Sequence, residues 1–250
     1  MKPQNTELYK VVGLFPELTL EERLASLRQV AVGRIVFTTS LGMEDQAIAH
    51  AIFSQNLDIE IVTLDTGRLF AEHYVLWAET EARYSAKIAS VFPCRKAVEA
   101  MVAKQGINGF YDSVENRKAC CSVRKVEPLG RILAGADVWI TGLRAAQTAG
   151  RGQLEFIGWD GVRKLQKTNP LLDWSTEQLE AYIASHNVPV NPLHVKGYPS
   201  IGCQPCTRAV TTGQNERSGR WWWEQNIKGE AGQECGLHIG PDGRLVRAKS

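Results

Sequence analysis

The chain is poor in several features that would assign it to a special class of protein. It has no apolar run close to the roughly eighteen residues of a membrane-spanning helix. Its net charge is only +2, which is too small to indicate a nucleic-acid or membrane partner. It has no internal repeat and no low-complexity stretch. Residues 1–7 are polar throughout, so we expect no secretory signal and a cytoplasmic protein.

What is present is the composition of an ordinary globular protein. The 250 residues are 44% hydrophobic and 22% charged, which is enough apolar material to bury a full core. This length fits one large domain or one domain with a smaller addition. A cytosolic enzyme agrees with these bulk properties.

Segments of strand character alternate with segments of helical periodicity through the first two-thirds of the chain. Short apolar strands separated by helices favour parallel pairing with both faces covered, so we predict an α/β fold. A hairpin turn is predicted at Asp160–Gly161, and few periodic elements follow residue 187. The predicted strands cover residues 34–39, 60–64, 86–92 and 136–141. The predicted helices cover residues 20–30, 44–55, 69–84, 115–133 and 176–186, with Thr19 and Ser175 as N-caps.

The loops after the first, second and fourth predicted strands carry small, polar and basic residues. They read TTSLGMED over residues 38–45, LDTGR over 64–68 and TGLR over 141–144, the last followed by Gln147 and Arg151. None is a Walker A or a Gly-x-Gly-x-x-Gly sequence. Backbone amides at helix N-termini and arginine forks both bind phosphate or sulfate, and parallel strands end at one edge of a sheet. The loops therefore predict an anionic, nucleotide-like ligand.

Six cysteines stand in the chain, and four of them form two close pairs. Cys120 and Cys121 are adjacent, and Cys203 and Cys206 are the ends of a Cys-x-x-Cys sequence. Four thiolates are what an iron–sulfur cluster or a structural zinc ion needs, whereas a disulfide framework suits short secreted chains. Zinc sites usually use two Cys-x-x-Cys pairs or cysteine with histidine. The two pairs therefore predict a shared metal and favour iron–sulfur without excluding zinc.

The other cysteines and a tryptophan run have different interpretations. Cys94 follows an apolar run, so we expect a small buried side chain. Cys235 lies in a glycine-rich segment, where a mobile nucleophile is expected. The run of three tryptophans over residues 221–223 either packs at the base of the tail, which we favour, or stacks on a base.

Seven motifs taken together resemble the assimilatory sulfonucleotide reductases, and specifically the bacterial iron–sulfur adenylyl-sulfate reductases. The resemblance extends over residues 20–238 and implies a PP-loop, adenine-nucleotide α-hydrolase-like fold with a parallel twisted sheet. One departure is Ala145–Ala146, where the family often has arginine or glutamate after Gly-Leu-Arg. The motifs are SLGMED (40–45), LDTGR (64–68), CCSVRK (120–125), ITGLR (140–144), GCQPCTR (202–208), ERSGRWWW (216–223) and ECGLH (234–238).

The resemblance also implies roles for individual residues. The two cysteine pairs, Cys120 with Cys121 and Cys203 with Cys206, would hold one [4Fe–4S] cluster, with Lys125 between the cluster and the substrate. The residues assigned to the substrate are Thr39, Ser40, Gly42, Leu64, Gly142, Arg144, Arg151, Arg217 and Arg220. The four arginines of this set would surround a phosphosulfate, although the match loosens after Gln147.

The implied reaction is the reduction of adenosine 5′-phosphosulfate (APS) to sulfite and AMP. The Cys235 thiolate would attack the substrate sulfur, and thioredoxin or a glutaredoxin-like dithiol would release sulfite from the resulting thiosulfonate. Residues 1–225 would form the nucleotide-binding domain with the cluster, and residues 226–250 a C-terminal arm. We expect no nucleic-acid or membrane partner, and a homo-oligomer is compatible with the sequence.

Three other functions would use some of the same sequence features. A reductase of the 3′-phosphorylated nucleotide (PAPS), or one of dual specificity, shares the nucleotide loops, but PAPS-specific relatives lack both cysteine pairs. A tRNA-modifying PP-loop enzyme should carry a Ser-Gly-Gly-x-Asp-Ser loop and a basic surface, and the chain has neither. A zinc-bound regulatory module leaves the strand-end loops and Cys235 without a role.

Overall fold

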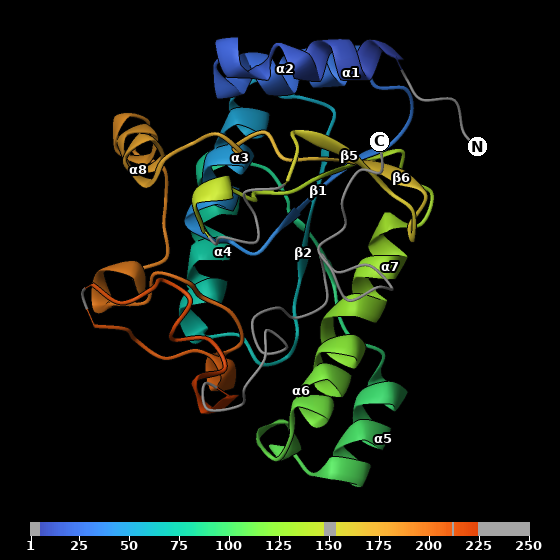
Figure 1. Ribbon diagram of the computed structural model, residues 1–250, viewed down its shortest axis with the longest axis vertical. Coiled ribbons are helices and arrows are strands. Elements are labelled where there is room, and N and C mark those ends of the chain that lie inside the picture. The colour runs from blue at the N-terminus through green and yellow to red at the C-terminus, as the bar shows by residue number, and fades with distance from the viewer. Residues whose placement is uncertain (1–5, 148–153, 212, 225–250) are drawn as a thin grey trace.

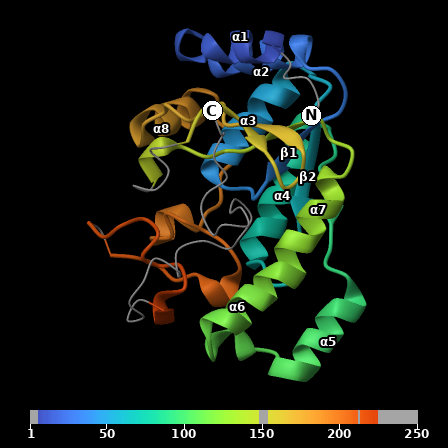
Figure 2. The ribbon, with the colours of Figure 1, turned by 45° about the vertical axis from the view of Figure 1, so that its right-hand side comes forward.

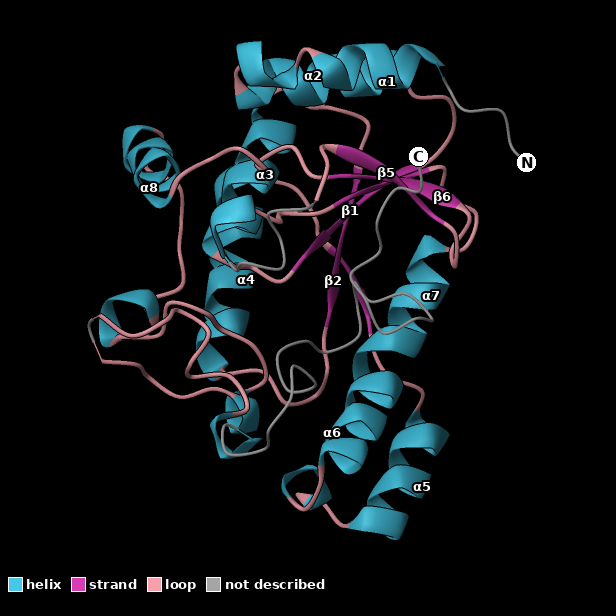
Figure 3. Ribbon diagram, viewed as in Figure 1, coloured by secondary structure: helices cyan, strands magenta, loops and turns pink. Residues whose placement is uncertain are grey.

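The computed structural model describes residues 6–147, 154–211 and 213–224. These residues form a six-stranded sheet with helices on both of its faces (Figures 1 and 3). None of the helices in the described ranges combines the length and the apolar character needed to cross a lipid bilayer. Arg151, Cys235 and the predicted arm 226–250 lie outside the described residues.

The sheet confirms the predicted parallel pairing. The strands lie in the order β3-β2-β1-β4-β6-β5, and only β5 runs antiparallel to its neighbour. The chain moves outward from β1 to β2 and β3, and then returns to place β4 on the other side of β1. Ligands of open α/β sheets bind beside such a reversal, outside the carboxyl ends of the strands. The strands are β1 (Ile35–Thr39), β2 (Glu60–Leu64), β3 (Ala89–Val91), β4 (Val138–Ile140), β5 (Ile157–Asp160) and β6 (Leu165–Thr168).

The predicted hairpin is present, but its turn is longer than the expected pair of residues. Asp160 pairs with Leu165 as the last residue of β5, and the backbone amide of Lys164 donates to the carbonyl of Asp160 over 2.7 Å. The connection therefore covers residues 161–164. The Asp160 carboxylate accepts hydrogen bonds from the backbone amides of Val162 and Arg163, which stabilise this wider turn.

The helices form two layers (Figures 1 and 2). One layer contains α1 (Thr6–Gly13), α2 (Leu20–Val30), α3 (Met43–Ser54), α4 (Ala71–Tyr84) and α8 (Thr176–Ser185). The other contains α5 (Arg95–Gln105), α6 (Val114–Cys121) and α7 (Glu127–Leu133). A π-helical segment over Ser122–Val126 joins α6 to α7, so the predicted helix over residues 115–133 is continuous but locally widened.

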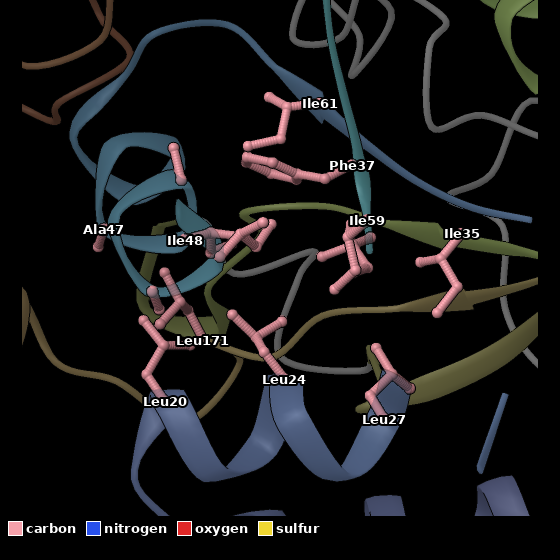
Figure 4. Packing of buried hydrophobic residues seen from close by; sticks show 14 of the residues in the cluster. Leu20, Leu24, Leu27, Ile35, Phe37, Ala47, Ile48, Ile59, Ile61 and Leu171 are labelled. Atoms are coloured by element: carbon pink, nitrogen blue, oxygen red, sulfur yellow. The ribbon is translucent and has the colours of Figure 1, made fainter. Parts of the chain in front are cut away.

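Each face of the sheet has its own hydrophobic core because strand side chains alternate between faces. Ile35 and Phe37 of β1 join the larger core, where they pack with residues of α2 and α3 (Figure 4). Helix α1 also contributes to this core. Val36, between Ile35 and Phe37, joins a second core with Leu129 and Ile132 of α7. Capping boxes at Thr19 and Ser175 confirm the two predicted N-caps.

Two helices were missing from the sequence-based prediction. Helix α5 buries none of its residues, so it lacks the apolar stripe that identifies an amphipathic helix. Helix α1 buries only Leu8 and Val12. The prediction that Cys94 is buried is wrong, because this residue is exposed where the chain enters α5. The apolar run before it ends at an exposed Phe92, which the pattern could not show.

The loop between β1 and α3 is tightened by a buried carboxyl group. Asp45 accepts hydrogen bonds from the backbone amide and the hydroxyl of Ser40 over 2.6 and 2.7 Å. Leu41 takes a left-handed backbone conformation, with φ of 58°, which costs a non-glycine residue energy and is held by these contacts. Burial raises the pKa of Asp45 to about 6, although the Ser40 hydrogen bonds oppose the rise.

Replacement of Asp45 by Asn should therefore change how stability depends on pH. A carboxyl group in the unfolded chain titrates near pH 3.9, so between about pH 4 and 6 the folded protein binds the extra proton. As the pH rises from about 4 to 6, the wild type should therefore lose about 2 kcal/mol of unfolding free energy relative to Asp45→Asn. Urea unfolding of both proteins across this range measures the difference, and a difference that stays constant with pH contradicts the expectation.

Candidate active site

A cavity of about 240 Å³ opens at the carboxyl ends of β1, β2 and β4. Its wall includes Thr39, Ser40 and Gly42 after β1, Leu64 at the end of β2, and Gly142 after β4. These five residues are the strand-end positions that the sequence assigned to the substrate, and the structure brings all of them to one cavity. The parallel register of β1 with both neighbours produces this convergence.

Three cations from outside the sheet also line the described part of the cavity wall. Lys125 comes from the π-helical segment, and Arg217 and Arg220 come from the irregular segment near the end of the described chain. His73 and His194 also line the cavity, and burial lowers the pKa of both. The pKa of His73 falls to about 4, because the charge of Lys125 adds to the effect of burial. The imidazoles are therefore neutral near pH 7, and the positive charge comes from lysine and arginine.

The position of Arg220 depends on a glycine. A Cβ atom at Gly202 would lie 2.3 Å from Nη2 of Arg220, so only glycine leaves room for the guanidinium in this place. Arg220 also lies over the ring of Trp221, with 4.9 Å between the guanidinium carbon and the ring centroid. Gly202 immediately precedes Cys203, so the glycine couples the position of Arg220 to the second cysteine pair.

Arg144 has a different environment from the one assigned to it. It is only 2% exposed, does not line the cavity, and donates from Nε to Glu44 over 2.9 Å. Gln147 donates to the same carboxylate oxygen over 2.8 Å. Glu44 is itself a cavity residue at the start of α3, so Arg144 acts on the cavity by holding Glu44.

The four paired cysteines line a second, smaller cavity. Cys120 and Cys121 reach it from the end of α6, and Cys203 and Cys206 flank a short 3₁₀ turn. Five cations surround the same space: Arg68, Arg117, Arg124, Lys125 and Arg220. Two pairs separated by about eighty residues are thus brought to one place, as the sequence predicts.

The two cavities share a wall. Lys125, Arg220 and Trp221 line both of them. Thr66 after β2 lines the first cavity and reaches the second, where its hydroxyl lies 3.2 Å from Sγ of Cys203. Any charge placed in the cysteine cavity therefore acts on groups that also face the strand-end cavity.

The ionisation of the thiols reflects their mutual proximity. Burial raises the pKa of Cys206 to about 12, with the charge of Cys203 as the second cause. Burial also raises the pKa of Cys203, but Lys125, the Thr66 hydrogen bond, Arg220 and Arg124 together bring that pKa below its usual value. Four neighbouring thiolates, two of them buried and two half-buried, repel one another, so the set needs a bound cationic group before all four can ionise.

The spacing of the sulfur atoms distinguishes between possible groups. A zinc ion holds its sulfur ligands about 3.8 Å apart, because each Zn–S bond is about 2.3 Å long. Within the described ranges no three cysteine sulfurs lie within 4.8 Å of one another. A cluster in which each sulfur binds a different metal ion has wider spacing. The four described cysteines thus fit a cluster, whose sulfur ligands need not lie so close together.

Two arginines at this centre were not identified from the sequence. Arg124 hydrogen-bonds to Cys120 and Arg117 to Cys121. Both arginines are four residues from their cysteine on one helix, a spacing that places side chains on the same face. This spacing was the available signal, and the prediction did not use it.

The tryptophan run packs against the cysteine region, and Trp221 also lines the strand-end cavity. The tail against which the run was expected to pack lies outside the described residues. Trp223 contacts Tyr111 with ring centroids 4.5 Å apart, and Trp221 lies beneath the guanidinium of Arg117 at 4.7 Å. Arg117 also forms a buried ion pair with Glu224, at 2.8 Å from Nε to Oε1. The end of the described chain is thereby fixed beside Cys121.

Comparisons with known proteins agree with this geometry. Residues 34–209 match the phosphoadenosine phosphosulfate reductase domain. The adenosine 5′-phosphosulfate reductase of Agrobacterium fabrum is 55% identical over 83% of this chain and 78% of its own length. That of Rhizobium meliloti is 53% identical over 89% of this chain and 82% of its own.

Solved structures show the same fold. The phosphoadenylyl-sulfate reductase of Candida auris, solved as a phosphate complex, is 25% identical with a TM-score of 0.70, over 84% of this chain and 99% of its own. Yeast FAD synthetase is 16% identical with a TM-score of 0.51, over 84% of this chain and 70% of its own, and shows likeness of fold alone. With the strand-end cavity and the paired cysteines, these matches identify the chain as a member of the phosphoadenosine phosphosulfate reductase family, among its adenosine 5′-phosphosulfate reductases.

Proposed function

We propose that the protein reduces APS to sulfite and AMP, with thioredoxin or a similar dithiol as the electron donor, in the assimilation of sulfate. The observation that carries the proposal is the wall of Lys125, Arg220 and Trp221, which stands between a nucleotide-sized cavity and four converging cysteines. The names of the relatives support the same substrate. A reducing cytoplasm suits the reaction, because it keeps thiols free.

The cavity wall offers surface suited to both parts of APS. Leu64, Met43 and Leu69 offer apolar surface to an adenine ring. Lys125, Arg217 and Arg220 offer positive charge to the phosphosulfate. Because Lys125 and Arg220 also line the cysteine cavity, a phosphosulfate bound to them would hold its sulfur near the shared wall.

The proposed chemistry uses Cys235 as the nucleophile. Its thiolate attacks the sulfur of APS, an S–S bond forms, and the bond to the phosphate oxygen breaks so that AMP leaves with the electron pair. Lys125 and the arginines stabilise the charge that develops on the leaving phosphate. One thiol of the dithiol then attacks the Cys235 sulfur and expels sulfite. Its second thiol closes a disulfide and returns Cys235 to the thiolate, so the dithiol supplies both electrons.

We further propose that Cys120, Cys121, Cys203 and Cys206 hold one [4Fe–4S] cluster. The convergence of four cysteines on one cavity and the cations that surround it support a cluster with net negative charge. When bound, it supplies a fixed charge beside the substrate rather than electrons, since the dithiol provides these. Arg124 and Arg117 stabilise the ionised cysteines through their hydrogen bonds to Cys120 and Cys121.

The cluster assignment predicts a brown protein with about four irons per chain. Replacement of any one of the four cavity cysteines by Ser should lower iron below about one per chain and bleach the visible absorption, because one ligand is lost. Cys94→Ser is the matched control, since Cys94 is exposed and outside the cavity, and it should keep its iron. Iron analysis after anaerobic purification makes the measurement, and an iron-free wild type contradicts the assignment.

Replacement of Cys235 by Ser should separate catalysis from binding. Turnover should fall by roughly a thousandfold or more, because the serine hydroxyl is a far weaker nucleophile. Iron content and APS affinity should remain, and Cys94→Ser again serves as the control. Wild type given ³⁵S-labelled APS without thioredoxin should retain label on Cys235 and release it as sulfite when reduced thioredoxin is added. Label on another residue, or turnover by the Ser variant, argues against the covalent mechanism.

The choice between APS and PAPS is the third test. In the described part of the cavity wall the lysines and arginines are Lys125, Arg217 and Arg220, and all three are assigned to the phosphosulfate. A 3′-phosphate would need additional cations, so kcat/KM for APS should exceed that for PAPS by at least about tenfold. AMP should correspondingly inhibit better than adenosine 3′,5′-bisphosphate. Equal or greater efficiency with PAPS would favour a dual-specificity or PAPS reductase.

A further inference from the structure

Two histidines and a glutamate meet at a point that belongs to neither cavity. Glu21 lies in the first turn of α2, His50 in α3, and His186 directly follows α8. One donor atom from each side chain lies within 4.8 Å of the other two. Helix α3 packs against both α2 and α8 (Figures 1 and 2), so the three donors come from elements that are already in contact.

Neighbouring hydroxyl groups hold two of the three side chains. The hydroxyl of Tyr182 donates a hydrogen bond to the carboxylate of Glu21. The hydroxyl of Tyr84 lies 2.9 Å from Nδ1 of His50, which orients the ring and leaves its other nitrogen for a ligand. Metal-binding histidines and carboxylates usually have such outer hydrogen bonds, because these fix the ring and the oxygen that binds.

The two imidazoles also lie close to each other. Their centroids are 4.8 Å apart, and the Tyr182 ring packs on His186 at 4.4 Å. Glu21 and His50 are half-buried while His186 is exposed, so an ion can approach from solvent. Arg83, a neighbouring cation, donates from Nη2 to the carbonyl of His186 and stacks on Tyr84.

We propose that Glu21, His50 and His186 form a binding site for a divalent transition-metal ion of the zinc type. Two imidazole nitrogens and a carboxylate are a donor set that zinc accepts, with water in the fourth position, whereas calcium and magnesium prefer oxygen alone. Bonds of about 2.0–2.1 Å place donors roughly 3.4 Å apart, so small side-chain rotations close the site. The site is independent of the proposed reductase function.

A bound ion would cross-link the segment that leads into the wall of the strand-end cavity. The chain leaves His186 through Asn187, whose φ is 50°, and reaches His194 on the cavity wall eight residues after His186. Gln46 of α3 already donates to the carbonyl of Pro189 over 2.9 Å. The ion would add a second connection between α3 and this segment, so it would stabilise the cavity from a distance.

In the test, the holoenzyme is first treated with a chelator to remove loosely bound metal ions and is then titrated with zinc chloride. Equilibrium dialysis should detect one zinc ion per chain at this site, and the melting temperature should rise by about 5 °C at a hundredfold excess over Kd. Glu21→Gln and His186→Asn should each weaken zinc binding by at least about a hundredfold and abolish the rise, since loss of an outer partner alone costs 10–100-fold. Glu180→Gln, an exposed carboxylate change on α8, is the matched control and should retain both effects.

Zinc K-edge absorption of the wild type provides a measurement that needs no variant. It should show nitrogen and oxygen ligands near 2.0 Å and no sulfur near 2.3 Å. A sulfur shell would assign the ion to the cysteines and overturn the proposal. Zinc binding that is unchanged in Glu21→Gln and His186→Asn would overturn it, as would a wild type that binds no zinc below about millimolar concentration. Circular dichroism monitors folding. The His186→Asn substitution should leave folding intact, because His186 is exposed.

Discussion

Thr66 occupies the turn at the end of β2, and its contacts hold three parts of the molecule together. Its hydroxyl meets the sulfur of Cys203, and its carbonyl oxygen accepts a hydrogen bond from Arg124 over 2.6 Å. Two residues later, the carbonyl of Arg68 accepts a hydrogen bond of 2.8 Å from the backbone amide of Gln204. The sheet, the cysteine-bearing helix and the irregular C-terminal segment are therefore positioned by one short loop, and both cavities depend on it.

The electrostatics of the centre follow from this arrangement. Cations gather around the cysteines because the sheet end, the π-helical segment and the segment after residue 200 each contribute one or more. The π-helical turn widens the helix between Cys121 and Lys125, and such turns often occur at functional positions. A single lysine can thus face the thiols and the strand-end cavity together. A change of charge in either cavity would therefore change the electrostatic potential in the other.

Much of the fold could be predicted from the sequence because β1, β2 and β4 are buried strands with strong apolar character and the loops after them have distinctive residues. Thr39, Leu64 and Gly142 line one cavity, which agrees with the prediction that the strand-end loops converge, because parallel strands end together. Whether Arg144 faces a ligand or a protein carboxylate could not be predicted in this way. A buried guanidinium that pairs with Glu44 has the same sequence signature as one that contacts a ligand. The spacing of cysteines predicts how many ligands meet but not how far apart they lie.

The buried ion pair of Arg117 with Glu224 has a consequence for the chain that follows it. Cys235 comes eleven residues after Glu224, and a chain of that length spans at most roughly 40 Å even when fully extended. Whatever path those residues take, the proposed nucleophile stays inside a sphere of that radius centred on Glu224. One thiol in such a volume corresponds to a local concentration on the order of several millimolar. A soluble thiol at ordinary cellular levels would have to compete for the substrate with the tethered Cys235 thiol, whose local concentration does not fall on dilution.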